Sequence, residues 1–464
     1  MHRKNAWEQY DAAQAAELEA FAADYKRFLD GGKTERVCVA EAVEAAKAAG
    51  FRDLSDVLAE GGKLKAGDRV YYAWMGKDFM AFIIGREPLS AGMNILGAHI
   101  DSPRVDVKQN PLYEDENLAY LDTHYYGGIK KYQWVTLPMA IHGVIVRRDG
   151  GKVAVAIGEK PEDPVFCFSD LLIHLSADQM GKKASEVIEG EALNLIVGGK
   201  PLKDAEKDAV KQNVLALLKE QYGVEEEDLL SAELEIVPAG ACRDLGFDRS
   251  MILGYGHDDR VCAFPSMRAV LDFEGTPDYT LCAILTDKEE IGSVGATGMN
   301  SNFFENTVAE LLSALDEPYS ELTLRRALRA SRMLSSDVSA GFDPNFASVF
   351  EKKNAAFLGK GVCFNKFTGS RGKGGSNDAN AEFMAEIRRI MDGAEVDFQT
   401  AELGRVDAGG GGTIAYMCAK YGMNVIDAGI AVLSMHAPWE IVAKCDLWEA
   451  YKCYRAFLKE ARPL

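Results

Sequence analysis

Several apolar segments of this 464-residue chain end on side chains that could bind a metal or move a proton. The segments are "NILGAHID", "CAILTDKEEIG", "RMLSSDVS" and "GIAVLSMHAPWE". The side chains at their ends are His99 and Asp101, Glu289 and Glu290, Asp337, and His436. Ligands of open α/β sheets bind beyond the carboxyl ends of the strands, so neighbouring strands would bring these groups to one edge.

These residue types suit zinc, because imidazole nitrogen and carboxylate oxygen are both good zinc ligands. Two zinc ions about 3.5–4 Å apart also need a carboxylate that bridges them. The pair Asp258-Asp259 in "GYGHDDRVCAF" could supply it. One of the two adjacent glutamates would then remain as a general base for water. We therefore expect two Zn²⁺ per subunit, with Mn²⁺ or Co²⁺ as alternatives for the same ligands.

Each of these features also has an ordinary structural explanation. A histidine at a strand end often only forms a hydrogen bond or lies at the surface. Paired aspartates at a helix start cap the helix and favour its dipole, and paired glutamates in a loop are commonly solvated. The segment "SSDVSAGFD" could be a turn with side-chain-to-backbone hydrogen bonds. Only their recurrence after separate strands predicts a metal site.

The elements that must position such a site alternate between helix and strand. Helices are predicted over residues 260–273, 304–332, 377–392, 413–421 and 440–459, and strands over residues 279–286 and 395–401. The N-terminal part adds helices over residues 6–30 and 35–50, a hairpin within 68–87 and a strand in "MNILGAHI". This alternation predicts an α/β fold with a mixed, largely parallel sheet between helices.

A region of different character interrupts this pattern. Residues 117–158 alternate β-branched and aromatic residues with glycine-rich turns, which predicts antiparallel strands, and a helix follows at about 204–221. We expect a catalytic domain formed by residues 1–103 and 236–464, with an inserted β-rich domain over residues 104–235.

Composition excludes several classes of function. The net charge of −19 provides no basic field for nucleic acid or an anionic membrane. The N-terminus has no apolar signal segment, and no apolar run is long enough to span a bilayer. Nine cysteines without a CxxC pair indicate reduced thiols, so we expect a cytoplasmic protein.

Taken together, the motifs resemble the aspartyl aminopeptidase family of di-zinc metallopeptidases, bacterial type, within the clan of co-catalytic zinc exopeptidases. The matching segments span residues 97 to 440 and are "GAHIDSPR", "HDDRVCAFPSM", "DKEEIGSVGATG", "SSDVSAGFDPNF", "GGSNDANAE", "DAGGGGTIA" and "SMHAPWE". The resemblance implies a metal-dependent aminopeptidase that hydrolyses the N-terminal residue of peptides. Another hydrolase of the clan (a carboxypeptidase or deacylase) and a non-catalytic assembly protein are the alternatives.

The resemblance also implies roles for individual residues. Asp258 rather than Asp259 is the bridging ligand, because "DDRVCAFPSMRAVLD" aligns without gaps on the family's Asp-Asn-Leu segment. Glu289 resembles the general base, which takes a proton from water and passes it to the leaving amine. Asp101 resembles the carboxylate that orients the ligand histidine. The implied metal ligands are His99, Asp258, Glu290, Asp337 and His436.

Two expectations concern the substrate and the assembly. The segment "LPMAIHGVIVRR" resembles the family segment whose histidine reaches the neighbouring subunit's active site, which makes His142 a substrate contact in trans. The inserted domain would serve dimerisation, within a homo-dodecamer built from dimers. Arg371 and Lys373 in "TGSRGKGGSND" could bind an acidic N-terminal residue or could be solvated loop charges. This loop is richer in glycine than the eukaryotic pattern, so a neutral or hydrophobic preference stays open.

Overall fold

The computed structural model describes residues 4–369 and 371–464. The chain divides into two compact units. The first contains the chain up to Asp101 together with residues 242–435 and 440–464, and the second contains residues 102–241 and 436–439. The predicted α/β elements and the predicted antiparallel strands therefore fall in different units.

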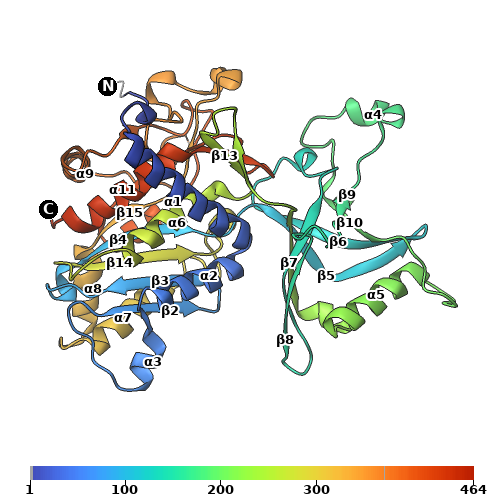
Figure 1. Ribbon diagram of the computed structural model, residues 1–464, viewed down its shortest axis with the longest axis horizontal. Helices are drawn as coiled ribbons and strands as arrows, with labels where there is room; N and C mark the ends of the chain where they lie inside the picture. The colour runs from blue at the N-terminus through green and yellow to red at the C-terminus, as the bar shows by residue number, and fades with distance from the viewer. Residues whose placement is uncertain (1–3, 370) are drawn as a thin grey trace. The chain divides into compact units, whose positions relative to one another are not determined.

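Within the described residues, nine strands of the first unit form one mixed sheet in the order β1-β2-β3-β14-β4-β15-β19-β17-β18 (Figure 1). The central strands β14, β4, β15 and β19 run parallel to one another, and antiparallel neighbours flank them. This confirms the predicted mixed α/β sheet. The strands are β1 (Arg52–Asp53), β2 (Arg69–Trp74), β3 (Asp78–Ile83), β4 (Met93–His99), β14 (Thr280–Thr286), β15 (Arg332–Ser335), β17 (Val362–Asn365), β18 (Phe398–Thr400) and β19 (Asn424–Gly429).

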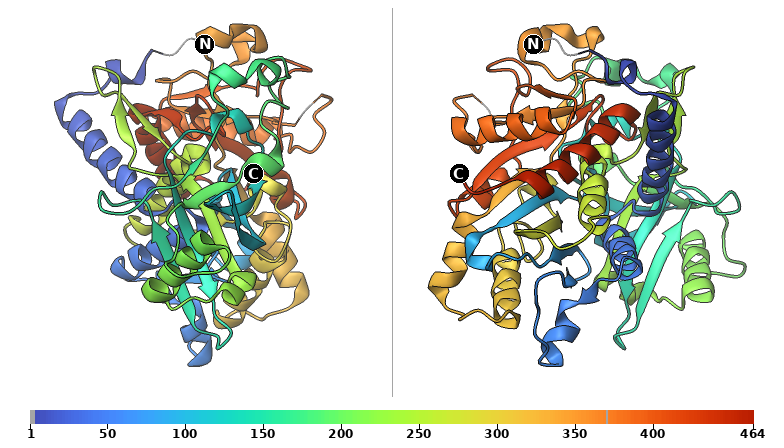
Figure 2. Two further views of the ribbon diagram at one scale, coloured as in Figure 1. Left: turned by 90° about the vertical axis from the view of Figure 1, so that its right-hand side faces the viewer. Right: turned by 60° about the vertical axis from the view of Figure 1, so that its left-hand side comes forward.

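Helices cover both faces of this sheet (Figure 1). Successive side chains of a strand point to opposite faces, and β4 shows it: Leu96 and Ala98 belong to one apolar core, Met93 and Ile95 to the other. The helices of the first core are α1 (Ala12–Gly31), α2 (Glu35–Ala48), α6 (His257–Leu271), α9 (Ala381–Gly393) and α11 (Lys444–Glu460). Those of the second are α3 (Leu54–Ala59), α7 (Phe303–Ala314), α8 (Glu321–Ala330) and α10 (Ala415–Ala419). Figure 2 shows α1, α6 and α11, in blue, yellow-green and red, side by side.

Several helix boundaries differ from the prediction, and three of the differences have a clear physical cause. Helix α1 begins at Ala12 rather than at residue 6, because Asp11 and Gln14 form a reciprocal capping box. The predicted helix over 304–332 is two helices, and Pro318 lies between them. The predicted C-terminal helix starts at Lys444, because residues 440–443 pair as a strand with β13.

The second unit is built on a seven-stranded antiparallel sheet, counted within the described residues, in the order β8-β7-β11-β5-β6-β10-β9. These strands confirm the predicted β character of residues 117–158. Helix α5 (Ala209–Tyr222) packs on β5, β6 and β10 and starts five residues later than predicted. The elements are β5 (Arg104–Asp115), β6 (Leu118–Tyr126), β7 (Met139–Val146), β8 (Lys152–Ile157), β9 (Cys167–Phe168), α4 (Ala177–Met180), β10 (Leu195–Gly198) and β11 (Ala232–Pro238).

Two small sheets complete the first unit. They comprise β12 (Arg243–Leu245), β13 (Met251–Gly254) and β21 (Glu440–Ala443), and the pair β16 (Ser339–Ala340) and β20 (Ala431–Val432). No helix among the described residues is both long and apolar enough to cross a membrane.

Candidate metal centre

The candidate centre of the first unit lies where three parallel strands end. In register, Thr286 of β14 is opposite His99 of β4, and Ser335 of β15 is opposite Gly97. The segments that follow β14 and β15 carry the glutamate pair and Asp337. Parallel pairing therefore brings together residues that are far apart in the sequence.

His99, the last residue of β4, is only 2% exposed and contacts two carboxylates. Its Nε2 lies 3.2 Å from Asp258 Oδ1, and its Nδ1 lies 3.2 Å from Asp101 Oδ1 and 3.0 Å from the Asp101 carbonyl oxygen. Burial lowers the pKa of His99, but the hydrogen bonds with Asp101 and Asp258 outweigh it and raise that pKa well above its ordinary value. The ring is thus held from one side and offers Nε2 to the cluster.

Asp258 and Asp259 lie at the start of α6 but do not have helical backbone angles, and the peptide bond between them is cis. The Asp258 N–H donates to Glu440 Oε2 at 3.0 Å, while Asp259 Oδ2 accepts the His99 N–H at 3.4 Å. The two adjacent carboxylates therefore have different contacts. Asp258 faces the imidazole nitrogen of His99, and Asp259 its backbone.

Glu289 and Glu290 lie in a single turn, η7 (Glu289–Ile291), directly after β14. Both side chains are half-buried. The carboxylate of Asp101 accepts the Glu289 N–H at 3.1 Å and the Glu290 N–H at 3.2 Å. Asp101 consequently contacts both the His99 ring and the glutamate turn.

Asp337 lies two residues beyond β15. Its backbone carbonyl oxygen would be 1.8 Å from a Cβ at Gly429, so only glycine allows β19 to pass this close. Burial, and then the neighbouring charge of Asp259, raise the pKa of Asp337 well above its usual range. Burial likewise raises the pKa of Asp259.

These residues form two overlapping groups whose ligand atoms lie within 4.8 Å of one another. The groups are His99 with Glu289 and Glu290, and His99 with Asp258 and Asp337. Buried carboxylates this close repel one another unless they are protonated or a cation is present. The nitrogen and oxygen donors therefore fit divalent zinc, and a bound cation would supply the missing positive charge.

His436, the remaining predicted ligand, belongs to the short segment 436–439 that clusters with the second unit. Its Nδ1 lies 2.9 Å from the Gly128 carbonyl oxygen. The residues on either side of this segment, Met435 and Glu440, belong to the first unit.

His142 lies in β7 of the second unit and is 4% exposed. Its Nε2 lies 2.8 Å from Glu159 Oε1. Its Nδ1 has no hydrogen-bond partner among the described residues. One ring nitrogen is thus fixed by Glu159, and the other is buried without a hydrogen bond to the described residues.

Arg371 and Lys373 lie in an exposed loop of the first unit. Lys373 Nζ is 3.0 Å from Asp378 Oδ2 and lies 3.9 Å from the centre of the Phe367 ring. Neither cation belongs to the two groups of clustered ligand atoms.

Sequence reasoning did not identify two contacts. Glu440, the acceptor of the Asp258 N–H, is the last residue of "SMHAPWE", so that motif could have indicated it. The second is at His257, whose Nδ1 lies 2.6 Å from the Tyr25 hydroxyl and whose pKa burial lowers to about 3. Nothing in the local sequence indicates its partner 232 residues away.

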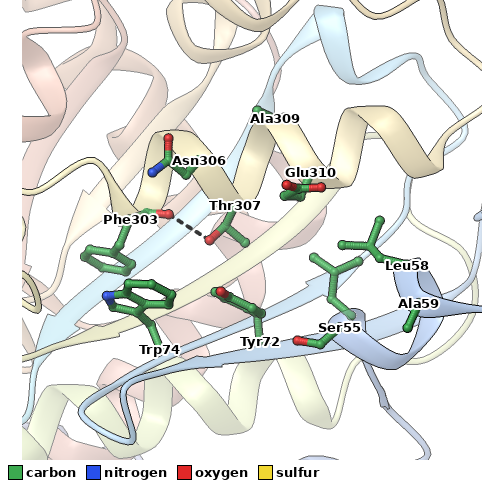
Figure 3. Close-up of a pocket in the computed structure, with 11 residues that line it drawn as sticks. Ser55, Leu58, Ala59, Tyr72, Trp74, Phe303, Asn306, Thr307, Ala309 and Glu310 are labelled. Carbon is green, nitrogen blue, oxygen red and sulfur yellow. Dashed lines mark hydrogen bonds between the residues drawn. The ribbon is translucent and has the colours of Figure 1, made fainter.

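A cavity of about 700 Å³ lies elsewhere in the first unit, between α3, β2 and α7 (Figure 3). Tyr72, Trp74 and Glu310 line it, and none of its lining residues has a predicted role in the reaction. The cavity therefore shares no residue with the two groups of clustered ligand atoms. Trp74 nevertheless connects it to the loop after β14, because the indole N–H donates to the Ala296 carbonyl oxygen at 3.1 Å.

Known proteins share both the sequence and the structure. Residues 28–458 match the family described as Aminopeptidase I zinc metalloprotease (M18). A probable M18 family aminopeptidase 1 of Clostridium acetobutylicum is 59% identical over 456 residues, covering 98% of each chain. The crystal structure of aminopeptidase I from that organism has a TM-score of 0.92 at 57% identity and covers 99% of each chain. An M18 aminopeptidase from Thermotoga maritima has a TM-score of 0.93 at 44% identity, covering 99% of this chain and 100% of its own. The chain therefore belongs to the M18 family of zinc metalloproteases and is an aminopeptidase.

Proposed function

We propose that this aminopeptidase uses a co-catalytic pair of zinc ions held by five side chains. The ligands are His99, Asp258, Glu290, Asp337 and His436, with Asp258 as the carboxylate shared between the two ions. The observation that carries this proposal is the pair of overlapping ligand groups that meet at His99. We include His436 because it lies in the motif "SMHAPWE", in which Met435 and Glu440 belong to the first unit.

When bound, zinc ions lower the pKa of water toward 7 and polarise a carbonyl group. Glu289 is the proposed general base, which takes the proton of the attacking water and delivers it to the leaving amine. Its half-buried carboxylate belongs to the same ligand group as His99 and Glu290. Asp101 is the proposed orienting residue, since its contacts with His99 Nδ1 and with the two glutamate N–H groups hold both sides of the cluster.

We infer that the second unit mediates dimerisation and that His142 serves a neighbouring subunit. Leu171, Leu172, Ile173 and Leu175 form an exposed apolar segment of this unit, between 46% and 70% exposed. Exposed apolar patches of this kind mark protein interaction sites. Among the proteins of similar fold is the S. cerevisiae mApe1 dodecamer, at 21% identity and a TM-score of 0.77. We propose an assembly of the same kind here, in the cytoplasm.

We also propose that Arg371 and Lys373 bind an acidic N-terminal residue, with a neutral or hydrophobic preference as the alternative. Lys373 is paired with Asp378, so its charge is partly neutralised. A panel of aminoacyl-p-nitroanilides with acidic, neutral and hydrophobic residues would establish the preference. The panel, repeated with added Zn²⁺, Mn²⁺ or Co²⁺, would also identify the working metal.

Glu289→Gln and His99→Ala test the proposed roles together. Glu289→Gln should retain both zinc ions by elemental analysis but lose activity by roughly 1,000-fold or more, because general-base catalysis contributes about 10²–10⁴-fold. His99→Ala should instead lose zinc. Substrates with an acetylated N-terminus should resist the wild-type enzyme. Survival of Glu289→Gln activity contradicts the base assignment, and cleavage of acetylated substrates would indicate a carboxypeptidase or deacylase.

A further inference from the structure

The loop that follows β14 contains three polar side chains that hold one another. Lys288 Nζ donates to Asp287 Oδ2 at 2.5 Å and to Thr297 Oγ1 at 2.8 Å. The Thr297 hydroxyl in turn donates to Asp287 Oδ2 at 2.7 Å. We call Asp287, Lys288 and Thr297 the loop clasp. Its three members close a triangle between positions ten residues apart.

The clasp fixes the backbone immediately before the glutamate turn. Lys288 adopts a left-handed conformation with φ +67°, which is costly for a residue with a side chain. Its N–H donates to Asp287 Oδ1 at 2.8 Å, and its aliphatic stem lies against Gly295, where a Cβ would be 3.4 Å away. Both the side chain and the backbone of the residue preceding Glu289 are therefore held in place.

Two residues of the β2–β3 hairpin form hydrogen bonds with the loop that contains the clasp. Asp78 Oδ1 accepts the Asp287 N–H at 3.0 Å, and Trp74 donates its indole N–H to Ala296. Figure 3 shows the Trp74 indole beside Phe303 at one end of the cavity. Asp101 holds the glutamate turn through its two N–H groups. The turn is thus fixed at both ends by groups on strands or directly after them.

The positive charge of Lys288 stabilises the buried carboxylate of Asp287. The Asp287 side chain is 1% exposed, and Lys288 is 24% exposed. Burial raises the pKa of Asp287, the charges of Glu35 and Asp101 raise it further, and Lys288 opposes them. Removing one partner of a buried ion pair leaves an uncompensated charge and disturbs its neighbours.

We propose that Lys288 and Thr297 are positioning residues for the reaction. Through Asp287 they fix the direction in which the Glu289 and Glu290 side chains leave the turn. This inference rests on the roles proposed above for those two glutamates. The turn carries a general base and a metal ligand on adjacent residues, so its position must be accurate. A displacement of 1 Å can cost about 100-fold in rate.

Thr297→Val tests the proposal by removing the bridging hydroxyl at nearly constant volume. We expect kcat to fall about 10- to 100-fold with KM changed less than about twofold, and zinc affinity, measured by chelator competition, to fall about 10- to 100-fold. Hydrogen exchange of peptides covering residues 285–300 should accelerate. Thr297→Ser, which restores the hydroxyl, should recover kcat, zinc affinity and protection.

Lys288→Met carries the same test if Thr297→Val fails to fold, because the lysine side chain is partly exposed. The double variant should lose no more than the worse single variant, since the clasp acts as one unit. Lys452→Met is the matched control: Lys452 is 30% exposed and pairs with the buried Glu449 at 2.9 Å, outside this loop. It should leave kcat and zinc affinity unchanged.

Two results would overturn the inference. One is a folded Thr297→Val enzyme with wild-type kcat, zinc affinity and exchange, and the other is a Thr297→Ser enzyme as impaired as the valine variant. The exchange experiment separates this inference from the proposed function. If hydrogen exchange is faster in Thr297→Val and Glu289→Gln is active, the clasp does hold the loop but Glu289 is not the general base. Unchanged exchange with an inactive Glu289→Gln would reject the clasp alone.

Discussion

The two sheets of this chain place chemically competent side chains in opposite ways. In the first unit, β14, β4 and β15 run parallel, so their carboxyl ends lie at one edge and deliver His99, the glutamate pair and Asp337 together. In the second unit, neighbouring strands run antiparallel, and successive strand ends alternate between edges. A many-residue centre therefore forms readily in the first unit.

The antiparallel sheet presents a single group from the middle of a strand instead. His142 is opposite Glu235 on β11 and Ala156 on β8, and its Nε2 is fixed by Glu159. Such a group cannot assemble a metal site by itself, but it can add one positioned contact to a site completed by another chain. We therefore propose that one unit holds the chemistry and that the other contributes a contact to it.

His142→Ala tests that separation and should have a larger effect than substitutions at Asp446 or Lys373. Loss of a donor that stabilises a developing oxyanion costs about 100- to 1,000-fold in kcat, while zinc content should stay at the wild-type level. His124→Ala is the matched control, because His124 lies on β6 of the same unit and its Nδ1 lies 2.8 Å from the Tyr125 carbonyl oxygen. Steady-state kinetics and elemental analysis of both variants check the prediction.

Mixing subunits distinguishes a contribution in trans from one in cis. Hybrids of His142→Ala and Glu289→Gln subunits should regain activity, because one subunit supplies the intact base and its neighbour the intact histidine. Hybrids that remain inactive would place His142 in its own subunit's site. Wild-type activity of His142→Ala would reduce the second unit to an assembly role.

Much of the first unit could be predicted because its signals are local. Apolar strands that end on charged residues predicted the edge of the sheet, and the structure brings His99, Asp258, both glutamates and Asp337 into shared groups. The roles of these residues remain proposals. The existence of the helices and strands followed from period and turn residues. Several boundaries were wrong, three of them where a cap, a proline or a strand pairing decided them.

The contacts that sequence reasoning missed join residues far apart in the chain. Asp101 reaches the glutamate turn across 188 residues, and Glu440 reaches Asp258 across 182. A local motif can mark the carboxylate, as "SMHAPWE" does for Glu440, but it does not reveal which distant backbone N–H that carboxylate accepts. The sequence did not indicate the loop clasp either, because Lys288 and Thr297 come into contact only when the turn folds.

The two units should also differ in how their stability depends on pH. Substitution of Asp446 in the first unit should have an effect of intermediate size. Burial raises the pKa of this α11 carboxyl to about 7, despite N–H donors from Gly359 and Gly361 at 2.7 Å. The unfolded pKa is about 3.9, so the folded state binds the proton more tightly, and this contribution is full below about pH 4 and is lost as pH rises through 7. We expect Asp446→Asn to remove about 1–3 kcal/mol of pH-dependent change in the free energy of unfolding between pH 4 and 8.

Asp163 of the second unit should behave with the opposite sign. The N–H groups of Lys160 and Gly158 donate to this half-buried carboxylate and lower its pKa. Its contribution is present above the ordinary carboxyl pKa and is lost as pH falls, so Asp163→Asn should lower the free energy of unfolding near neutral pH and have little effect under acidic conditions. Urea unfolding of both variants across pH measures the two signs, and equal slopes would contradict the assignment.

Lys373→Met should have the smallest effect and tests whether the exposed loop reads the substrate. The ammonium group is shared with Asp378 and screened by water, and exposed pairs contribute little. We expect kcat/KM for acidic aminoacyl-p-nitroanilides to fall about two- to threefold, with neutral substrates unchanged. Lys366→Met, which removes the other cation paired with Asp378, is the control for a general loss of charge. A different outcome is a fall in kcat/KM beyond about tenfold that occurs only in Lys373→Met and only with acidic substrates. It would show that this lysine leaves Asp378 when substrate binds. It would also place substrate selection in the first unit alone.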